Sequence, residues 1–181
     1  PAGLIMTMTR GMLRAEVLNR HRPAHILRHL NRVMYADLDN SSRFVTLFYS
    51  EYNPQTRELA FANAAHNPPM LWQATTQTIV PLDTDGMLMG FAREGDFEDA
   101  RIQLSSGDAL MYYTDGFTEA VNASGERFEV ENLQQAFIRA CQQDLKAQQT
   151  LDYLFAEVDR FVGADQSGND DMTLVVMKVT T

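Results

Sequence analysis

Residues 109–120 of this 181-residue chain read ALMYYTDGFTEA. The first five are apolar or aromatic, which is typical of a short and largely buried strand. A carboxylate, Asp115, follows that strand directly, and Gly116 after it lets the backbone approach a ligand closely. Functional side chains are often carried on loops that a rigid scaffold holds in place. The stretch therefore predicts a strand that ends in a candidate site.

A second acidic stretch mirrors the first. Residues 168–176 read GNDDMTLVV, so Asp170 and Asp171 come directly before a strongly apolar strand. Carboxylates gathered at adjacent strand ends, without His or Cys nearby, form a hard oxygen site suited to Mg²⁺ or Mn²⁺. Such ions can activate a water and clamp a phosphoryl group. The two stretches together indicate a candidate metal site.

Both stretches also have an ordinary structural explanation. Asp-Gly is a common hairpin turn, and Asn-Asp-Asp before a strand fits a plain loop. Against the hairpin, the residues after Gly116 do not alternate as a returning strand would. Glu119 would face the same site as Asp115 if a helical turn began there. The spacing alone leaves the metal site and the plain turn both open.

Four helices are predicted from apolar residues at helical spacing. The first covers about residues 3–19, and its apolar face is Leu4, Met8, Gly11, Met12, Ala15 and Leu18. The second begins at Pro23, which suits the first turn of a helix, and its apolar face is Leu27, Leu30, Met34 and Leu38. The last two cover about residues 130–141 and 151–162, and Gly163 ends the latter.

Strands are predicted between these helix pairs and after them. A hairpin is expected from residues 44–52 and the segment around Leu59 and Phe61. Short strands follow at 69–73, 78–81, 98–104 and 109–114, and turn residues 105–108 join the last two. Residues 172–179 form a final apolar strand, expected at the centre of a sheet. This order predicts an α+β layered fold of antiparallel sheets covered by helices.

Composition narrows the class of protein. A formal net charge of −9 disfavours a nucleic-acid partner, because phosphate backbones attract clustered Lys and Arg. The single cysteine, Cys141, excludes a disulfide framework or a cysteine-based metal site within one chain, so a reducing cytoplasm is expected. No apolar run approaches the roughly 20 residues that span a bilayer, so no membrane contact within the chain is expected.

The histidines are a weaker signal. His21, His25 and His29 fall four residues apart, as a row of zinc ligands on a helix would. Pro23 places His21 before the helix, however, and no acidic or Cys ligand follows at a suitable spacing, so surface or partly packed side chains are predicted. His66 could act as an acid or base near pH 7, but a structural turn between strands is the favoured interpretation.

Three stretches of the chain are the sharpest motifs: residues 113–120 (YTDGFTEA), 125–128 (GERF) and 169–176 (NDDMTLVV). Four more precede these three: residues 44–49 (FVTLFY), 63–69 (NAAHNPP), 87–90 (MLMG) and 106–108 (SGD). In this order the stretches resemble the stage II sporulation protein E branch of the type 2C protein phosphatases. The resemblance covers essentially the whole chain.

The resemblance implies a layered sandwich of two antiparallel β-sheets flanked by helices, with metal ions between the sheets. Carried over by residue, Asp115 and Asp170 become metal ligands and catalytic residues, and Gly116 keeps the turn open. Asp171 falls where relatives often have Asn and is expected to support the ligands. The predicted metal-site residues are thus Asp115, Gly116, Asp170 and Asp171. Two Mn²⁺ or Mg²⁺ ions are expected in the intact domain, where they activate a water that attacks phosphoserine or phosphothreonine directly.

The resemblance also implies partners. Typical substrates of the family are phosphorylated anti-sigma-factor antagonists, in bacterial signal transduction. The catalytic domain usually follows a sensor or receiver domain, and a homodimer is left open. A second function stays under consideration, in which the chain is a catalytically inactive phosphatase-like adaptor that binds a regulatory partner.

The chain departs from the family pattern at three places. Relatives carry an Asp and a Gly-Lys-Gly turn just upstream of the first long helix, whereas this helix opens the chain as Pro1-Ala2-Gly3-Leu4. Residues 1–181 are therefore expected to be a single phosphatase-like domain whose first strands and metal-bridging Asp are missing, and which binds metal poorly and catalyses little. Ala65 and Glu129 stand where Gly is usual, which is expected to affect loop geometry only.

Overall fold

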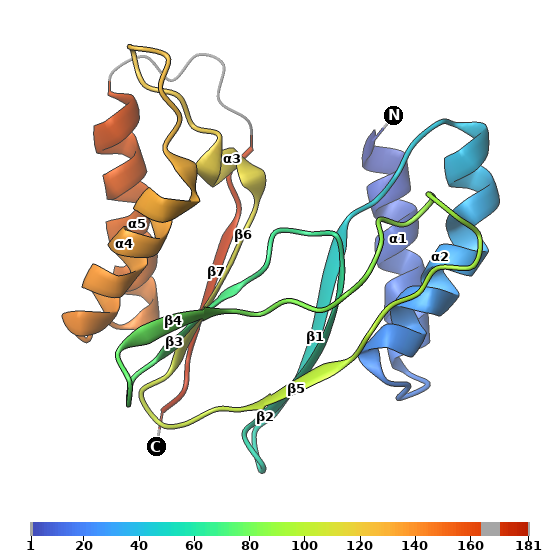
Figure 1. Cartoon of the computed structure of the whole chain (residues 1–181), viewed down its shortest axis with the longest axis horizontal. Helices are drawn as coiled ribbons and strands as arrows, with labels where there is room; N and C mark the ends of the chain where they lie inside the picture. The colour runs from blue at the N-terminus through green and yellow to red at the C-terminus, as the bar shows by residue number, and fades with distance from the viewer. Residues whose placement is uncertain (1, 164–170, 181) are drawn as a thin grey trace. The chain divides into compact units, whose positions relative to one another are not determined.

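The computed structural model describes residues 2–163 and 171–180. The chain forms two compact units. The N-terminal unit comprises Pro1–His66 and Asp83–Gln103, and the C-terminal unit comprises Asn67–Leu82 and Leu104–Thr181. Each unit contains one antiparallel sheet and one pair of long helices (Figure 1). The predicted α+β class with two antiparallel sheets is confirmed.

The N-terminal unit has a three-stranded sheet in the order β1-β2-β5. Its elements are α1 (Ala2–Val17), α2 (Pro23–Asn40), β1 (Leu47–Asn53), β2 (Glu58–Ala64) and β5 (Ala100–Gln103). The predicted hairpin is β1-β2, in which Leu47 lies opposite Ala64 and Asn53 lies opposite Glu58.

Helix α2 covers this sheet with the face that its periodicity predicts. Leu27, Met34 and Leu38 have no exposed surface, and they belong to a core with Tyr49 and Ala62 of the hairpin. Full burial of each such side chain stabilises the fold by roughly 1.5–3 kcal/mol. This burial fixes α2 on the sheet of its own unit.

Helix α1 packs with a face that overlaps the predicted one only in part. Met8 and Met12 contact the core as expected, and Ile5 joins them. Leu4 and Leu18, by contrast, are 70% and 81% exposed. The first segment is apolar on several sides, so helical spacing alone could not decide which side packs.

The C-terminal unit has a four-stranded sheet in the order β4-β3-β6-β7. Its elements are β3 (Met70–Gln73), β4 (Thr78–Pro81), β6 (Ala109–Tyr113), α3 (Asp115–Thr118), α4 (Glu129–Gln142), α5 (Ala147–Val162) and β7 (Leu174–Lys178). Side chains of α4 and α5, such as Phe137 and Leu154, form one core with Trp72 and Met111 of the sheet. Gly163 follows α5 with a φ of 80°, as its predicted role at a helix end requires. No helix in the described ranges is both long and apolar enough to cross a bilayer.

Two strands that the sequence placed side by side belong to different sheets. The residue pair Leu59 and Ile102 joins β5 to β2, whereas β6 pairs with β3 and β7. The turn between them is held by buried Asp108, which accepts hydrogen bonds from the backbone N–H groups of Ala74 (2.9 Å) and Ser105 (2.8 Å). A turn signal shows that the chain bends, but it does not show which strands then pair.

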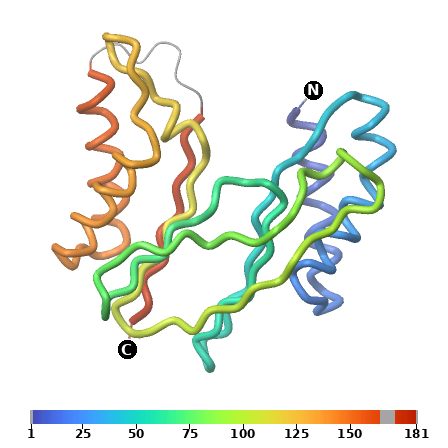
Figure 2. The backbone as a smooth tube through the Cα atoms, in the orientation of Figure 1, coloured from blue at the N-terminus to red at the C-terminus, as the bar shows by residue number. Residues whose placement is uncertain are grey.

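The expectation that the final strand is central was wrong. Among the described residues β7 pairs with β6 alone and is therefore an edge strand. Figure 2 shows the backbone of β7, in red, running along that of β6, in yellow. Leu174 and Val176 pack on the core, while Val175 between them is 54% exposed. An apolar run is typical of a strand buried on both faces, but the run itself does not report how many neighbours the strand has.

Candidate metal site

The strand pair β6-β7 continues past its last ladder residues through Thr114. Tyr113 lies opposite Leu174. Beyond this pair, the Thr114 N–H donates to the Thr173 carbonyl (3.2 Å), and the Thr173 N–H donates to the Thr114 hydroxyl (3.0 Å). That hydroxyl also donates to the carbonyl of Asp171 (3.4 Å). The residues that leave β6 and the residues that enter β7 are therefore fixed at one end of the sheet.

Asp115 begins a single helical turn, α3, and not a hairpin. The Asp115 carbonyl accepts hydrogen bonds from the Glu119 N–H (2.8 Å) and the Thr118 hydroxyl (3.0 Å). Phe117 has no exposed surface, and its ring meets Phe155 edge-on at a centroid distance of 5.0 Å. The buried ring anchors the turn in the core. The backbone of Asp115 is thus held firmly while its side chain is exposed.

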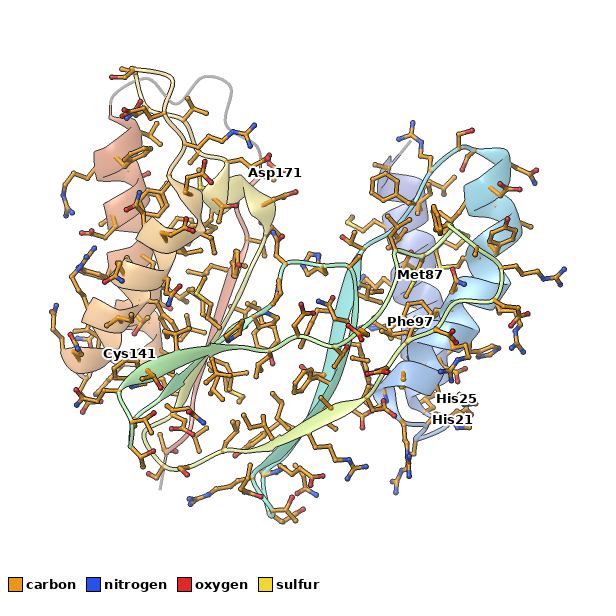
Figure 3. All side chains as sticks on the ribbon, viewed as in Figure 1. His21, His25, Met87, Phe97, Cys141 and Asp171 are labelled. Atoms are coloured by element: carbon orange, nitrogen blue, oxygen red, sulfur yellow. The ribbon has the colours of Figure 1, made fainter. Side chains whose placement is uncertain are left out.

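The predicted site residues divide into three groups. Asp115 and Asp171 are both exposed, and Thr114 fixes them at the same end of the sheet. Figure 3 labels Asp171 where the chain enters β7. Gly116 is buried as the second residue of α3. Asp170 lies outside the described residues. The structure thus brings together two of the three predicted carboxylates and says nothing of the third.

Glu119 does not add a free carboxylate to this site. Its side chain forms an ion pair with the Arg127 guanidinium at 2.9 Å. The backbone of Arg127 also pairs with that of Val121 as an isolated antiparallel β-bridge. Asn122 closes the loop between them, because its side-chain oxygen accepts hydrogen bonds from two backbone N–H groups, at 2.9 and 3.0 Å. The sequence analysis did not predict that Arg127 pairs with Glu119, although Arg127 belongs to the GERF stretch at residues 125–128.

The donor chemistry fits a hard divalent cation. Asp115 and Asp171 offer carboxylate oxygens, which Mg²⁺ and Mn²⁺ prefer, and Mg²⁺ usually keeps several waters beside one or two carboxylates. Within residues 2–163 and 171–180, Asp115 does not belong to any cluster of three ligand-type side chains. The described residues therefore provide part of an oxygen site for such an ion.

His66 has the structural role that the sequence favoured. The buried Asn63 amide donates to the His66 carbonyl (2.9 Å) and accepts from the His66 N–H (2.8 Å), which closes the turn after β2. The same amide donates to Asp83 (2.6 Å). The His66 ring lies 3.1 Å from the Thr46 hydroxyl. These bonds account for the position of His66 without an acid–base role.

The sequence model of the stage II sporulation protein E family matches residues 1–180. The chain belongs to this family of metal-dependent phosphatases, as its ordered motifs and its two helix-covered sheets indicate. The resemblance found in the sequence is confirmed.

Individual relatives are more distant. The chain is 27% identical over 180 residues to the phosphoserine phosphatase RsbU of Bacillus subtilis (strain 168), a match that covers 98% of this chain and 51% of RsbU. The chain therefore spans about half the length of that relative.

Solved structures with a similar fold include two phosphatase-related domains. The SiaA-PP2C domain of Pseudomonas aeruginosa superposes with a TM-score of 0.80 at 18% identity, over 98% of this chain and 70% of that one. The RsbU and RsbW domains of Rv1364c from Mycobacterium tuberculosis give a TM-score of 0.74 at 20% identity, over 99% of this chain and 48% of that one. At these identities the structures support the fold alone.

Proposed function

We propose that this chain is the catalytic part of a metal-dependent serine/threonine phosphoprotein phosphatase. The observation that carries the proposal is the position of Asp115. It follows β6 beside the residues that enter β7, and its backbone is held by hydrogen bonds while its carboxylate is exposed. A catalytic carboxylate needs this combination of a fixed origin and an accessible oxygen.

In this proposal Asp115 and Asp170 hold Mg²⁺ or Mn²⁺, with two ions in the intact domain, and Asp171 supports them. When bound, such ions supply an activated water at neutral pH and offset the charge of a phosphoryl group. Thr114 keeps the two acidic segments in register, and Gly116 leaves room at the start of α3. Phe117 prevents α3 from shifting by filling the core beneath it.

The proposed substrate is a phosphorylated anti-sigma-factor antagonist or a similar phosphoprotein. One comparison supports a phosphoprotein substrate, because the relative RsbU is named a phosphoserine phosphatase. Control by an upstream sensor or receiver domain, self-association and a cytoplasmic location remain predictions. So does the organisation of residues 1–181 as one domain that lacks a metal-bridging Asp.

The test is release of phosphate from a phosphoserine peptide by the full chain with Mn²⁺ titrated in. Asp115→Asn should abolish release. Asp152→Asn on the exposed face of α5 is the matched control and should change nothing, because within residues 2–163 and 171–180 the partner of Asp152 is Gln148, which donates a hydrogen bond to it. Release that survives Asp115→Asn would contradict the mechanism. Because residues 1–181 are expected to bind metal poorly, the inactive adaptor is favoured only if release and Mn²⁺ binding are also absent from a folded form of the protein extended upstream of Pro1.

A further inference from the structure

The turn between α1 and α2 gathers three side chains of metal-binding types, far from Asp115 in the sequence. Glu16 lies in the last turn of α1, His21 in the connecting turn and His25 in the first turn of α2. One possible ligand atom from each lies within 4.8 Å of the other two. The His21 and His25 rings stack at a centroid distance of 4.2 Å. Figure 3 labels both residues near the turn between α1 and α2.

Glu16 is the residue that the sequence interpretation overlooked. An acidic ligand was sought after the histidines, but Glu16 precedes them, and only the helix hairpin brings it back beside His21 and His25. It is 6% exposed. Carboxylates are rarely buried to this degree unless they are paired. The partners of each carboxylate oxygen of Glu16 therefore decide what this cluster can bind.

The two carboxylate oxygens of Glu16 have different surroundings. Oε2 lies 2.7 Å from Nδ1 of His29 and accepts a hydrogen bond from Asn19 at 3.3 Å. Oε1 faces Nε2 of His21 at 3.8 Å, which is too long for a hydrogen bond. Two ligand atoms at about 2.0–2.1 Å from a tetrahedral zinc ion lie roughly 3.3 Å apart. A movement of about half an ångström would thus bring this pair to zinc-binding separation.

The chemistry of the cluster selects the class of ion. Imidazole and carboxylate ligands together suit zinc, and an orienting hydrogen bond behind a ligand, such as that between His29 and Glu16, is the usual support of such sites. Arg28 and Arg32 lie nearby, where they line a small hollow with His25 and His29. Their positive charge disfavours Mg²⁺ or Ca²⁺, which bind through charge and oxygen alone, more than an ion that bonds to imidazole nitrogen.

We infer that Glu16, His21 and His25 form a binding site for one zinc ion at the α1–α2 turn, with His29 positioning the Glu16 carboxylate. A water completes the tetrahedron on the side of His21, whose side chain is 43% exposed. The site links the end of α1 to the start of α2. It lies wholly within the N-terminal unit and does not depend on the proposed phosphatase activity.

The test is a zinc titration of the full chain by calorimetry, in 5 mM Mg²⁺ to occupy oxygen-only sites. The expected result is one equivalent bound with a dissociation constant in the micromolar range or below. His21→Gln and His25→Gln should each weaken binding by more than about tenfold, and His29→Gln by about tenfold. His66→Gln is the matched control, because His66 is the remaining histidine of the chain and lies in the turn after β2; it should bind zinc as the unmodified chain does.

Two outcomes would overturn the inference. One is the absence of zinc binding below 100 µM in the unmodified chain, which would leave Glu16 and His29 as a plain ion pair. The other is unchanged binding in both His21→Gln and His25→Gln. Since both rings are exposed, these variants should fold, and circular dichroism checks this. Resonances of the ring nitrogens give an independent readout: zinc should shift those of His21 and His25 and leave those of His66 in place.

Discussion

The hydroxyl of Thr114 accepts a hydrogen bond from the backbone N–H of Thr173 at 3.0 Å, beyond the last ladder pair of β6 and β7. A side-chain hydrogen bond thereby continues the link between the two strands beyond their last backbone pair. The O–H of the same hydroxyl donates to the Asp171 carbonyl, so one threonine ties both acidic segments to each other.

Thr114→Val should lower phosphatase activity and metal affinity, since valine has the same shape but neither accepts nor donates a hydrogen bond. Loss of the two bonds should also cost about 1–2 kcal/mol of unfolding free energy. Thr114→Ser is the control, because it keeps the hydroxyl. The comparison is made by urea unfolding and by Mn²⁺ titration of activity. Equal behaviour of the valine and serine variants would show that this hydroxyl does not position the site.

Asp170→Asn should raise the Mn²⁺ concentration needed for half-maximal activity by tenfold or more, because an amide is a weaker ligand than a carboxylate. Asp171→Asn should raise it less, since Asp171 is proposed to support the ligands and not to hold the ion. Both variants are compared by the same phosphate-release assay. The reverse order of effects would reassign the ligand to Asp171.

Ala65 and Glu129 both have left-handed backbones, with φ of 53° and 61°. This explains physically why glycine suits these positions, because a Cβ is disfavoured there. Ala65→Gly and Glu129→Gly should each raise the free energy of unfolding by about 0.5–1 kcal/mol. This is the net gain, from which the cost of the extra entropy that glycine gives the unfolded chain has been subtracted. Glu129→Ala keeps the Cβ and is the control. Stabilisation by alanine equal to that by glycine would rule out the backbone explanation.

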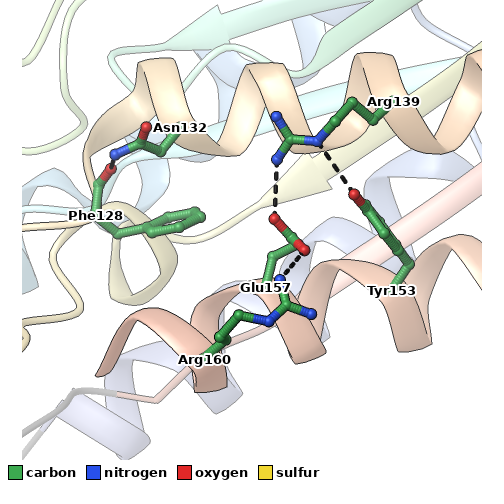
Figure 4. A network of polar contacts seen from close by, with 6 residues as sticks. All are labelled: Phe128, Asn132, Arg139, Tyr153, Glu157 and Arg160. Atoms are coloured by element: carbon green, nitrogen blue, oxygen red, sulfur yellow. Dashed lines mark hydrogen bonds and ion pairs between the residues drawn. The ribbon is translucent and has the colours of Figure 1, made fainter. Parts of the chain in front are cut away.

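Glu157 of α5 joins this helix to α4 through Arg139, and it also pairs with Arg160 of its own helix (Figure 4). It pairs with Arg160 and, at 2.9 Å, with Arg139, which also donates to the Tyr153 hydroxyl at 3.1 Å. The hydrogen bond from Arg160 lowers the pKa of Glu157, burial opposes this, and Arg139 lowers the pKa further, so that it lies below its ordinary value of 4.5.

A lowered carboxyl pKa stabilises the fold above the unfolded pKa, and this stability is lost as the pH falls through the folded pKa. Glu157→Gln should therefore cost about 1 kcal/mol at pH 7 and progressively less below pH 4.5. The measurement is urea unfolding from pH 7 down to pH 3. Glu94→Gln is the control, because Glu94 forms an exposed pair with Arg32 and should change stability little at any pH. A cost for Glu157→Gln that does not vary with pH would exclude an ionic contribution.

Cys141 should not react with thiol reagents at pH 8 while the chain is folded. Its side chain is 9% exposed, and burial raises the pKa of the thiol to about 12, with a smaller opposing effect from Lys178. The thiolate fraction at pH 8 is then on the order of one in ten thousand. Labelling with an aromatic disulfide reagent, in buffer and in 8 M urea, checks this. Rapid labelling in buffer would mean that α4 opens locally.

The sequence by itself determined the features that depend on neighbours along the chain. The spacing of Leu27, Met34 and Leu38 predicted the buried face of α2, because residues three, four and seven apart share one side of a helix. Residues 78–81 were predicted as a strand and form β4, and Gly163 ends α5 with the positive φ that a helix stop favours. The acidic residue at the end of β6 was also visible as a candidate, since it follows directly from the strand pattern.

Only the tertiary structure decided what depends on residues distant in sequence. It placed β5 and β6 in different sheets and, among the described residues, β7 at a sheet edge. Which strands pair depends on all the strands of the fold, so the sequence of one strand does not specify its neighbours. It made Asp115 the start of a helical turn, since the burial of Phe117 outweighs the hairpin preference of Asp-Gly. It also brought Glu16 beside His21 and His25. A helix hairpin places side chains from its two helices next to each other, and the linear spacing of the histidines could not reveal this contact.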